Sequence, residues 1–258
     1  MQRSILRDLL ILLGVFALIW LLASLFNYPE DPQLLSVEKE EKLGKAYVDL
    51  ILLNPMFEEL DNERIDSAVN VIGDRLKKGL HASDYQYSFM VFDSEMINAF
   101  TVPGGNILIS SGLIGFCDTP EQLAAVIAHE MGHVEERHVI SRLIKELGLD
   151  ILTSGDQYVL GEVTGMLSSS KFDRKQEEAA DLFASELLEH SHIEPRTLAT
   201  FFRKLENETD NELMKHFEII STHPNFSSRI RNVLSYQPDA DFEALPMDLD
   251  WAAVRSGL

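Results

Sequence analysis

Apolar residues recur along most of the chain at helical spacing and alternate only in short stretches. The clearest helical segment is 61–80, where Gly79 suits the C-terminal end of a helix. Its apolar stripe consists of Ile65, Ala68, Val69, Ile72 and Leu76. Residues 35–54 carry a second helical pattern, with Ser36 as the predicted N-cap.

Strand patterns occur in the stretch that follows. In "YQYSFMVF", residues 85–92, every second side chain is apolar or aromatic, which predicts a half-buried strand. A loop containing "PGG", residues 103–105, leads into a second predicted strand, "NILIS", at 106–110. Helical patterns return afterwards, so the sequence predicts an α+β fold that is mostly helical with a small β-sheet.

The next predicted helix has an explicit start. Thr119 is a suitable N-cap, Pro120 occupies the first helical position, and Gln122 supplies the partner of a capping box. This helix is predicted to run to about Leu147. Residues 148–171 contain Gly and Ser and read as a loop or a marginal helix.

Three more helices complete the predicted domain. One covers 172–190, one opens at Pro195, and a short one follows "STHPNFSSRIRNVLS" at 221–235. The last residues, 237–258, are acidic and are predicted to be irregular.

The N-terminal part differs in character. Residues 9–26 read "LLILLGVFALIWLLASLF" without a charge, which is close to the length that crosses a bilayer. Two arginines precede this run and acidic residues follow it, so the positive-inside rule places the N-terminus in the cytoplasm. A single-pass anchor is predicted, in the inner membrane of a bacterial host with the rest of the chain in the periplasm. The alternatives are a cleaved signal peptide and a buried core helix.

These patterns divide the chain into five parts. They are a cytoplasmic N-terminus at 1–8, a transmembrane helix at 9–26, a linker at 27–35, a folded domain at 36–236 and an acidic C-terminal tail at 237–258.

Charge and cysteine content narrow the function classes. The chain has 42 acidic and 22 basic residues, for a net charge of −20. Nucleic acid as a partner is therefore excluded, because phosphates need a basic surface. Cys117 is the only cysteine, so no intrachain disulfide can form, and its apolar surroundings predict a buried small hydrophobe rather than a nucleophile.

The strongest chemical signal is "HEMGH" at 129–133. Residues four apart share one helix face, so His129 and His133 can bind the same ion, with Glu130 placed beside it to act on a water. Apolar residues before the motif predict a buried helix, where histidines need a partner that zinc would provide. The alternative is a solvated helix face.

A third protein ligand must come from elsewhere. His138 lies nine residues after His129, about half a turn out of phase, which predicts a surface histidine or one behind the ligands. Glu177 and Asp181 share one face of the 172–190 helix, so one can bind metal while the other supports a ligand histidine. By spacing alone, Glu178 could be the third ligand as well as Glu177. The alternative to a metal-binding role is that these acidic residues form a solvated face of the helix.

Four stretches together resemble the HtpX, CAAX prenyl protease and Oma-type family of zinc metalloendopeptidases, nearest to its single-pass envelope members related to BepA. In order they are "NAFTVPGGNILISSGL", "EQLAAVIAHEMGHVEERH", "FDRKQEEAAD" and "THPNFSSRI". The resemblance implies a zincin-like domain that binds one Zn²⁺ per chain. It assigns His129, His133 and Glu177 as ligands, Glu130 as general base, and Asp181 as a support for the ligands.

The same resemblance implies further site residues. His223 and Arg229 would lie near the metal and stabilise the oxyanion of the tetrahedral intermediate. Without the resemblance, the same residues are also compatible with a Thr-His-Pro turn that caps a short helix. The strand after "PGG" looks like the substrate-facing edge strand of the family, with a structural hairpin strand as the alternative. The residues expected to pair with an extended polypeptide are Gly105, Asn106, Ile107, Leu108 and Ile109.

The predicted function is that of a membrane-anchored zinc metalloendopeptidase that cleaves envelope or misfolded proteins. Its predicted partners are a polypeptide substrate and the lipid bilayer, and the oligomeric state stays open. The alternatives are a non-catalytic zinc-binding chaperone or assembly factor on the same scaffold, and an anchored scaffold without metal.

Overall fold

The computed structural model describes residues 35–148, 171–208 and 222–258, together with Phe16, Leu152, Val163 and Ile219. The chain separates into two compact units, Met1–Pro32 and Gln33–Leu258. The predicted transmembrane helix at 9–26 lies outside the described residues apart from Phe16. Among the residues that are described, no helix has the length and apolar character needed to span a bilayer.

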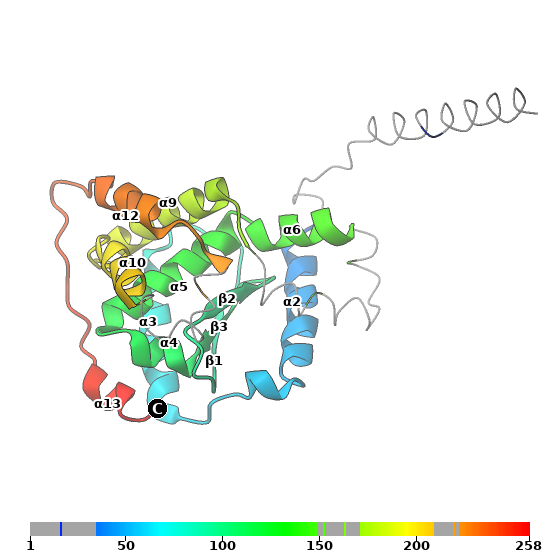
Figure 1. Ribbon diagram of the computed structural model, residues 1–258, viewed down its shortest axis with the longest axis horizontal. Coiled ribbons are helices and arrows are strands. Elements are labelled where there is room, and N and C mark those ends of the chain that lie inside the picture. The colour runs from blue at the N-terminus through cyan, green and yellow to red at the C-terminus, as the bar shows by residue number, and fades with distance from the viewer. Residues whose placement is uncertain are drawn as a thin grey trace, which may run out of the picture. The chain divides into compact units, whose positions relative to one another are not determined.

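The second unit is mostly helical and contains one small sheet, which confirms the predicted α+β class (Figure 1). The helices are α2 (Val37–Ile51), η2 (Pro55–Phe57), α3 (Glu63–Gly79), α4 (Ser111–Phe116), α5 (Pro120–Glu135), α6 (His138–Leu147), α9 (Arg174–His190), α10 (Thr197–Glu208), α12 (Phe226–Ser235) and α13 (Trp251–Arg255). The strands are β1 (Ser88–Phe92), β2 (Ala99–Val102) and β3 (Asn106–Ser110).

The three strands are ordered β1-β3-β2, with β3 parallel to β1 and antiparallel to β2. The "PGG" turn joins β2 to β3, and Gly104 and Gly105 adopt φ values of 79° and 83° that favour glycine. Strand β2 was not predicted from the sequence.

The place of β3 corrects the prediction of a substrate-facing edge strand. Because β3 is paired on both sides, its backbone cannot take up another chain, and the edges of the sheet are β1 and β2. The predicted pairing with a substrate is therefore wrong for Asn106, Ile107, Leu108 and Ile109. Gly105 lies in the turn before β3, and its contact with a substrate stays a prediction.

Helix α5 lies at the centre of the unit, between the sheet and α9 (Figure 1). Gly132 of α5 makes the close approach to α9 possible. A Cβ atom at this position would lie 2.9 Å from the carbonyl oxygen and 3.0 Å from the Cα atom of Ala180. The small residue inside "HEMGH" thus sets the spacing between the two helices that carry the candidate ligands.

The start of α5 is as predicted, but its end is not. The Thr119 side chain accepts a hydrogen bond from the Gln122 amide, and Pro120 opens the helix. The capping box is not completed, because the Gln122 side chain accepts from the Asp118 amide instead of the Thr119 amide. The predicted single helix up to Leu147 is wrong, because α5 ends at Glu135 and Arg137 takes a left-handed conformation with φ 54°. A separate helix, α6, then begins at His138.

Two apolar clusters hold the unit together. The larger one joins α3, α5, α9, α10 and α12 to one face of the sheet, and the smaller one joins α2 and α6 to the other face. In β3 the two faces alternate, since Ile107 and Ile109 belong to the larger cluster and Leu108 to the smaller one.

The C-terminal residues are more ordered than their composition predicted. They contain α13, and the Trp251 indole donates a hydrogen bond of 2.9 Å to the carbonyl oxygen of Cys117. Cys117 itself is a free cysteine and fully buried, as predicted. The segment therefore packs as part of the folded unit.

Candidate metal centre

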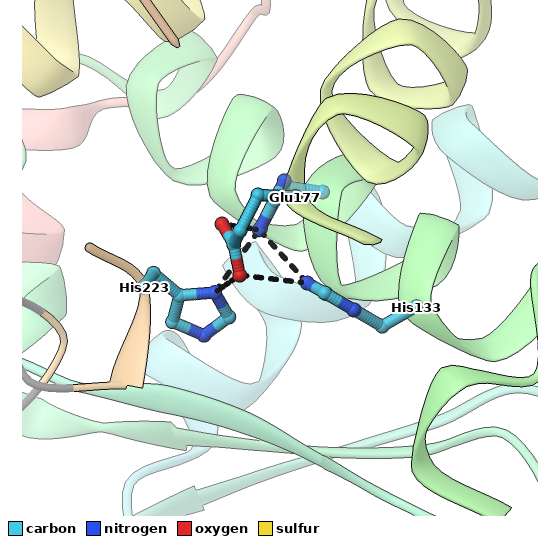
Figure 2. Close-up of side chains that lie close together, drawn as sticks. His133, Glu177 and His223 are labelled. Atoms are coloured by element: carbon cyan, nitrogen blue, oxygen red, sulfur yellow. Dashed lines mark hydrogen bonds and ion pairs between the residues drawn. The ribbon is translucent and has the colours of Figure 1, made fainter. Parts of the chain in front are cut away.

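Four buried side chains converge at the middle of α5. His129 and His133 come from α5, Glu177 from α9, and His223 from the segment before α12. One potential ligand atom from each lies within 4.8 Å of all the others, and Figure 2 shows His133, Glu177 and His223 pointing toward one another. Glu178 lies outside this cluster, because its carboxylate forms a 2.9 Å ion pair with Arg174 at the surface.

The geometry of the cluster suits a zinc ion. The Nε2 atoms of His129 and His133 are 3.1 Å apart, and His223 Nδ1 is 3.3 Å from His129 Nε2. A tetrahedral site with metal–nitrogen distances of about 2.0–2.1 Å has an edge of about 3.3–3.4 Å. Each Glu177 oxygen lies 3.6 Å from one of these imidazoles, so a nitrogen-rich set with one carboxylate surrounds a common point.

Asp181 and Arg229 lie directly behind the cluster. Asp181 Oδ1 is 3.0 Å from His129 Nδ1, the position of a carboxylate that orients a metal-binding histidine. Arg229 pairs with both acidic residues: its Nη2 is 2.6 Å from Asp181 Oδ1 and its Nη1 is 2.6 Å from Glu177 Oε2. Burial alone would raise the pKa of Asp181, but the guanidinium outweighs it and holds that pKa well below its usual range.

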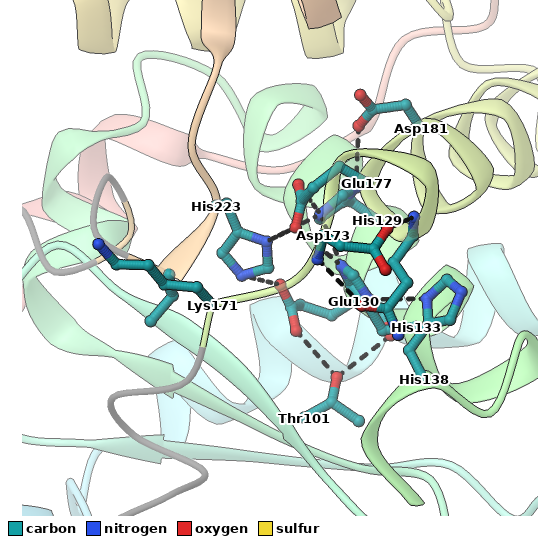
Figure 3. Close-up of polar contacts among 12 residues, drawn as sticks. Thr101, His129, Glu130, His133, His138, Lys171, Asp173, Glu177, Asp181 and His223 are labelled. Atoms are coloured by element: carbon teal, nitrogen blue, oxygen red, sulfur yellow. Dashed lines mark hydrogen bonds and ion pairs between the residues drawn. The ribbon is translucent and has the colours of Figure 1, made fainter. Parts of the chain in front are cut away.

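The second ligand histidine has a different support. His133 Nδ1 lies 3.0 Å from His138 Nδ1, and the Phe172 ring stacks on His133 with a centroid separation of 3.8 Å. Burial lowers the pKa of His138 to about 4, so the ring is neutral near pH 7. Of the two predicted places for His138, the one behind the ligands fits and the surface does not, because the break after α5 turns this buried residue back onto His133 (Figure 3).

Glu130 lies next to the cluster without joining it. The Thr101 hydroxyl of β2 is 2.9 Å from Glu130 Oε2, and His223 Nε2 is 3.5 Å from Glu130 Oε1 (Figure 3). Oε1 is buried and has no hydrogen-bond partner within the described part of the chain. Because a buried carboxylate oxygen without a partner is costly, this atom is suited to receive a water or a substrate group.

A pocket opens beside Glu130 and His223. Its walls come from β2, α6 and the segment before α9, and it is largely apolar. The lining side chains are Phe100, Thr101, Glu130, Val139, Arg142, Leu143, Phe172, Thr222 and His223.

Two residues of the site were missed by sequence reasoning. Thr101 belongs to "NAFTVPGG", a stretch that carried family resemblance but no assigned role. Phe172 precedes the α9 N-cap, and nothing in its local pattern indicated a contact with a ligand histidine 39 positions earlier.

Comparison with known proteins agrees with this geometry. A family model described as "Peptidase family M48" matches residues 61–237. The chain is 27% identical over 214 residues to the beta-barrel assembly-enhancing protease of Yersinia pestis, covering 76% of this chain and 43% of that protein. It is 30% identical over 183 residues to the mitochondrial metalloendopeptidase OMA1 of Arabidopsis thaliana, and the match covers 69% of this chain and 37% of that protein.

A third relative matches over more of its own length. The metalloprotease LoiP of Escherichia coli (strain K12) is 29% identical over 182 residues, which cover 66% of this chain and 68% of that protein. By contrast, the chain spans less than half the length of the other two relatives. Since the family model matches more than half of the chain, the protein belongs to peptidase family M48, which confirms the relationship to zinc metalloendopeptidases that its motifs predicted.

Proposed function

We propose that the protein is a zinc-dependent endopeptidase whose reaction takes place at the cluster of His129, His133 and Glu177. The observation that carries this proposal is the position of Glu130. Its Oε1 accepts no hydrogen bond from the described residues and is buried beside three converging ligand groups, at the wall of a pocket. A purely structural metal site has no need of such a carboxylate.

The residues then have distinct roles. His129, His133 and Glu177 would hold the ion, which when bound would polarise the scissile carbonyl and lower the pKa of a bound water toward neutrality. Glu130 accepts the proton of the attacking water at Oε1 and later passes it to the leaving amine. Thr101 keeps the other oxygen of Glu130 fixed throughout.

His223 and Arg229 receive different roles. His223 Nε2 lies 3.5 Å from Glu130 Oε1 at the pocket wall, where a proton donor can stabilise the developing oxyanion. Arg229 was expected to share this task, but its nitrogen atoms are engaged with Asp181 and Glu177. We assign Arg229 to holding those two carboxylates in position.

The proposed substrate is an extended polypeptide. Strand β2 is an edge of the sheet and carries Thr101, so a substrate aligned with β2 would pass Glu130 and the adjoining pocket. This replaces β3 as the predicted pairing strand.

We also propose a location in the cell envelope. The uncharged run at 9–26 supports a membrane anchor with the peptidase unit on the extracytoplasmic side. A bacterial relative named for enhancing β-barrel assembly supports envelope proteins as substrates.

The test compares the zinc-loaded full chain with its Glu130→Gln variant on an unfolded protein substrate. Glu178→Gln is the matched control, because that residue is half-exposed on α9 and ion-paired away from the site. Cleavage by the unmodified chain and the control, with loss in Glu130→Gln, is expected. Equal cleavage by all three would indicate a contaminant, and bound zinc without any cleavage would favour a chaperone or assembly factor.

A further inference from the structure

The chain makes an unusual turn directly after the ligand helix. Arg137, between α5 and α6, has φ 54° and ψ 30°, a left-handed conformation that costs a residue with a side chain about 1–2 kcal/mol. Such a conformation persists only when its surroundings hold it.

A buried carboxylate on α2 holds it. Arg137 Nη2 is 2.7 Å from Glu40 Oε2 and donates a 2.6 Å hydrogen bond to the Leu35 carbonyl oxygen. Glu40 is only 2% exposed, and it also accepts hydrogen bonds from the Tyr85 hydroxyl at 3.0 Å and the Gly104 amide at 3.3 Å. Helix α2 and the "PGG" turn therefore fix the junction between α5 and α6.

The turn determines where the next residue lies. If α5 continued unbroken, His138 would be about half a turn out of phase with His129. After the left-handed residue, the His138 ring instead lies with its Nδ1 3.0 Å from His133 Nδ1.

The protonation pattern of this contact follows from the ligand role of His133. Its Nε2 faces His129 and Glu177, so the lone pair used for the metal is on Nε2 and the ring proton is on Nδ1. His133 Nδ1 must then donate to His138 Nδ1. His138 is left with its own proton on Nε2.

We propose that His138 is a positioning residue that fixes the ring orientation and tautomer of the metal ligand His133, and that the Glu40–Arg137 ion pair sets its place. The two ligand histidines of α5 thus have unlike acceptors, the carboxylate of Asp181 for His129 and the imidazole of His138 for His133. This inference rests on the proposed function, because it concerns the same site.

The experiment measures zinc affinity of the full chain by competition with a chelator, and the visible spectrum of the Co²⁺-loaded chain. His138→Phe removes the acceptor and keeps a ring, whereas His138→Asn retains an oxygen acceptor. We expect about 10- to 100-fold weaker zinc binding for His138→Phe, the usual effect of losing a partner behind a ligand. A smaller loss is expected for His138→Asn, and none for His81→Phe, whose side chain is exposed.

Glu40→Gln tests the second half of the proposal with His138 intact. It is expected to weaken zinc binding and shift the Co²⁺ spectrum in the same direction as His138→Phe. The proposal is overturned if folded His138→Phe binds zinc as tightly as the unmodified chain. Should His138→Phe not fold, unchanged affinity in both His138→Asn and Glu40→Gln overturns it equally.

These readouts separate the inference from the proposed function. If the unmodified chain binds zinc but cleaves nothing, the peptidase proposal fails, and the order of zinc affinities still decides the role of His138. If the unmodified chain binds no zinc, both fail together.

Discussion

Arg229 and Asp181 form a two-point ion pair inside the protein, with Arg229 Nε 2.8 Å from Oδ2 and Nη2 2.6 Å from Oδ1 of the carboxylate. The third guanidinium nitrogen reaches Glu177, and the Phe202 ring lies 4.1 Å from Arg229 Cζ. One fully buried cation therefore compensates two buried carboxylates, and both of those carboxylates belong to the candidate metal centre. Stability and metal binding depend here on the same side chain.

Replacing Arg229 should be costly. Arg229→Met leaves two buried carboxylates without their cation and is expected to lower the free energy of unfolding by about 3–5 kcal/mol. The free energy of unfolding of Arg229→Lys should lie between those of the unmodified chain and Arg229→Met. An ammonium keeps the positive charge but cannot form the two-point contact. Urea unfolding of the metal-free chain measures both. Arg174→Met, at an exposed ion pair, is the control, and a stability of Arg229→Met equal to that control would contradict the compensation described above.

Thr101 should matter for the reaction and not for metal binding. Thr101→Val keeps the shape and removes the hydrogen bond to Glu130, worth about 1.5–3 kcal/mol for a charged acceptor. A fall in kcat/KM of about 10- to 100-fold is expected. Steady-state cleavage of a peptide checks this, with zinc affinity measured in parallel. Thr101→Ser retains the hydroxyl and should retain most activity; a Val variant as active as the Ser variant would remove Thr101 from the mechanism.

Gly132 should tolerate no side chain. In Gly132→Ala the added methyl meets the Ala180 backbone, so α9 must move together with Glu177. Such overpacking is expected to cost about 1–3 kcal/mol and to weaken zinc binding. Gly115→Ala in α4 is the matched control, since its methyl would meet only the end of the Leu258 side chain. Thermal unfolding and zinc competition report the difference, and equal behaviour of the two variants would argue against close helix contact.

Cys117 should be unreactive in the folded protein. Burial raises the pKa of its thiol well above the usual range, and the residue has no exposed surface. A thiol-specific reagent at about pH 8 should therefore label the native chain slowly and the denatured chain rapidly, because the thiolate is the reacting species. Rapid labelling of the native chain would mean that the α13 segment, which covers Cys117 through Trp251, opens readily.

The parts of the site that depend on one helix could be predicted from the sequence. His129 and His133 share a face of α5, and Glu177 and Asp181 share a face of α9, because helical spacing is a local property. Local spacing could not choose between Glu177 and Glu178. The two residues differ in burial, which depends on tertiary packing: Glu177 is buried where α9 packs against α5, and Glu178 is not.

The parts that depend on distant contacts could not be predicted in the same way. The end of α5 is set by the pairing of Arg137 with Glu40, 97 positions earlier, and no local signal marks it. The central place of β3 arises from a parallel pairing with β1 that a pattern of alternating residues does not reveal. The engagement of Arg229 by two carboxylates also requires α9 and α12 to be adjacent first.

The order of the site residues along the chain has a consequence for biosynthesis. His129 and His223 are separated by 94 positions, and Arg229 follows still later. Because a ribosome releases the chain from its N-terminus onward, the nascent protein carries an incomplete set of site residues until its last segments have emerged. Hydrolytic activity, which needs the complete set of site residues, would therefore arise only after nearly the whole unit is made.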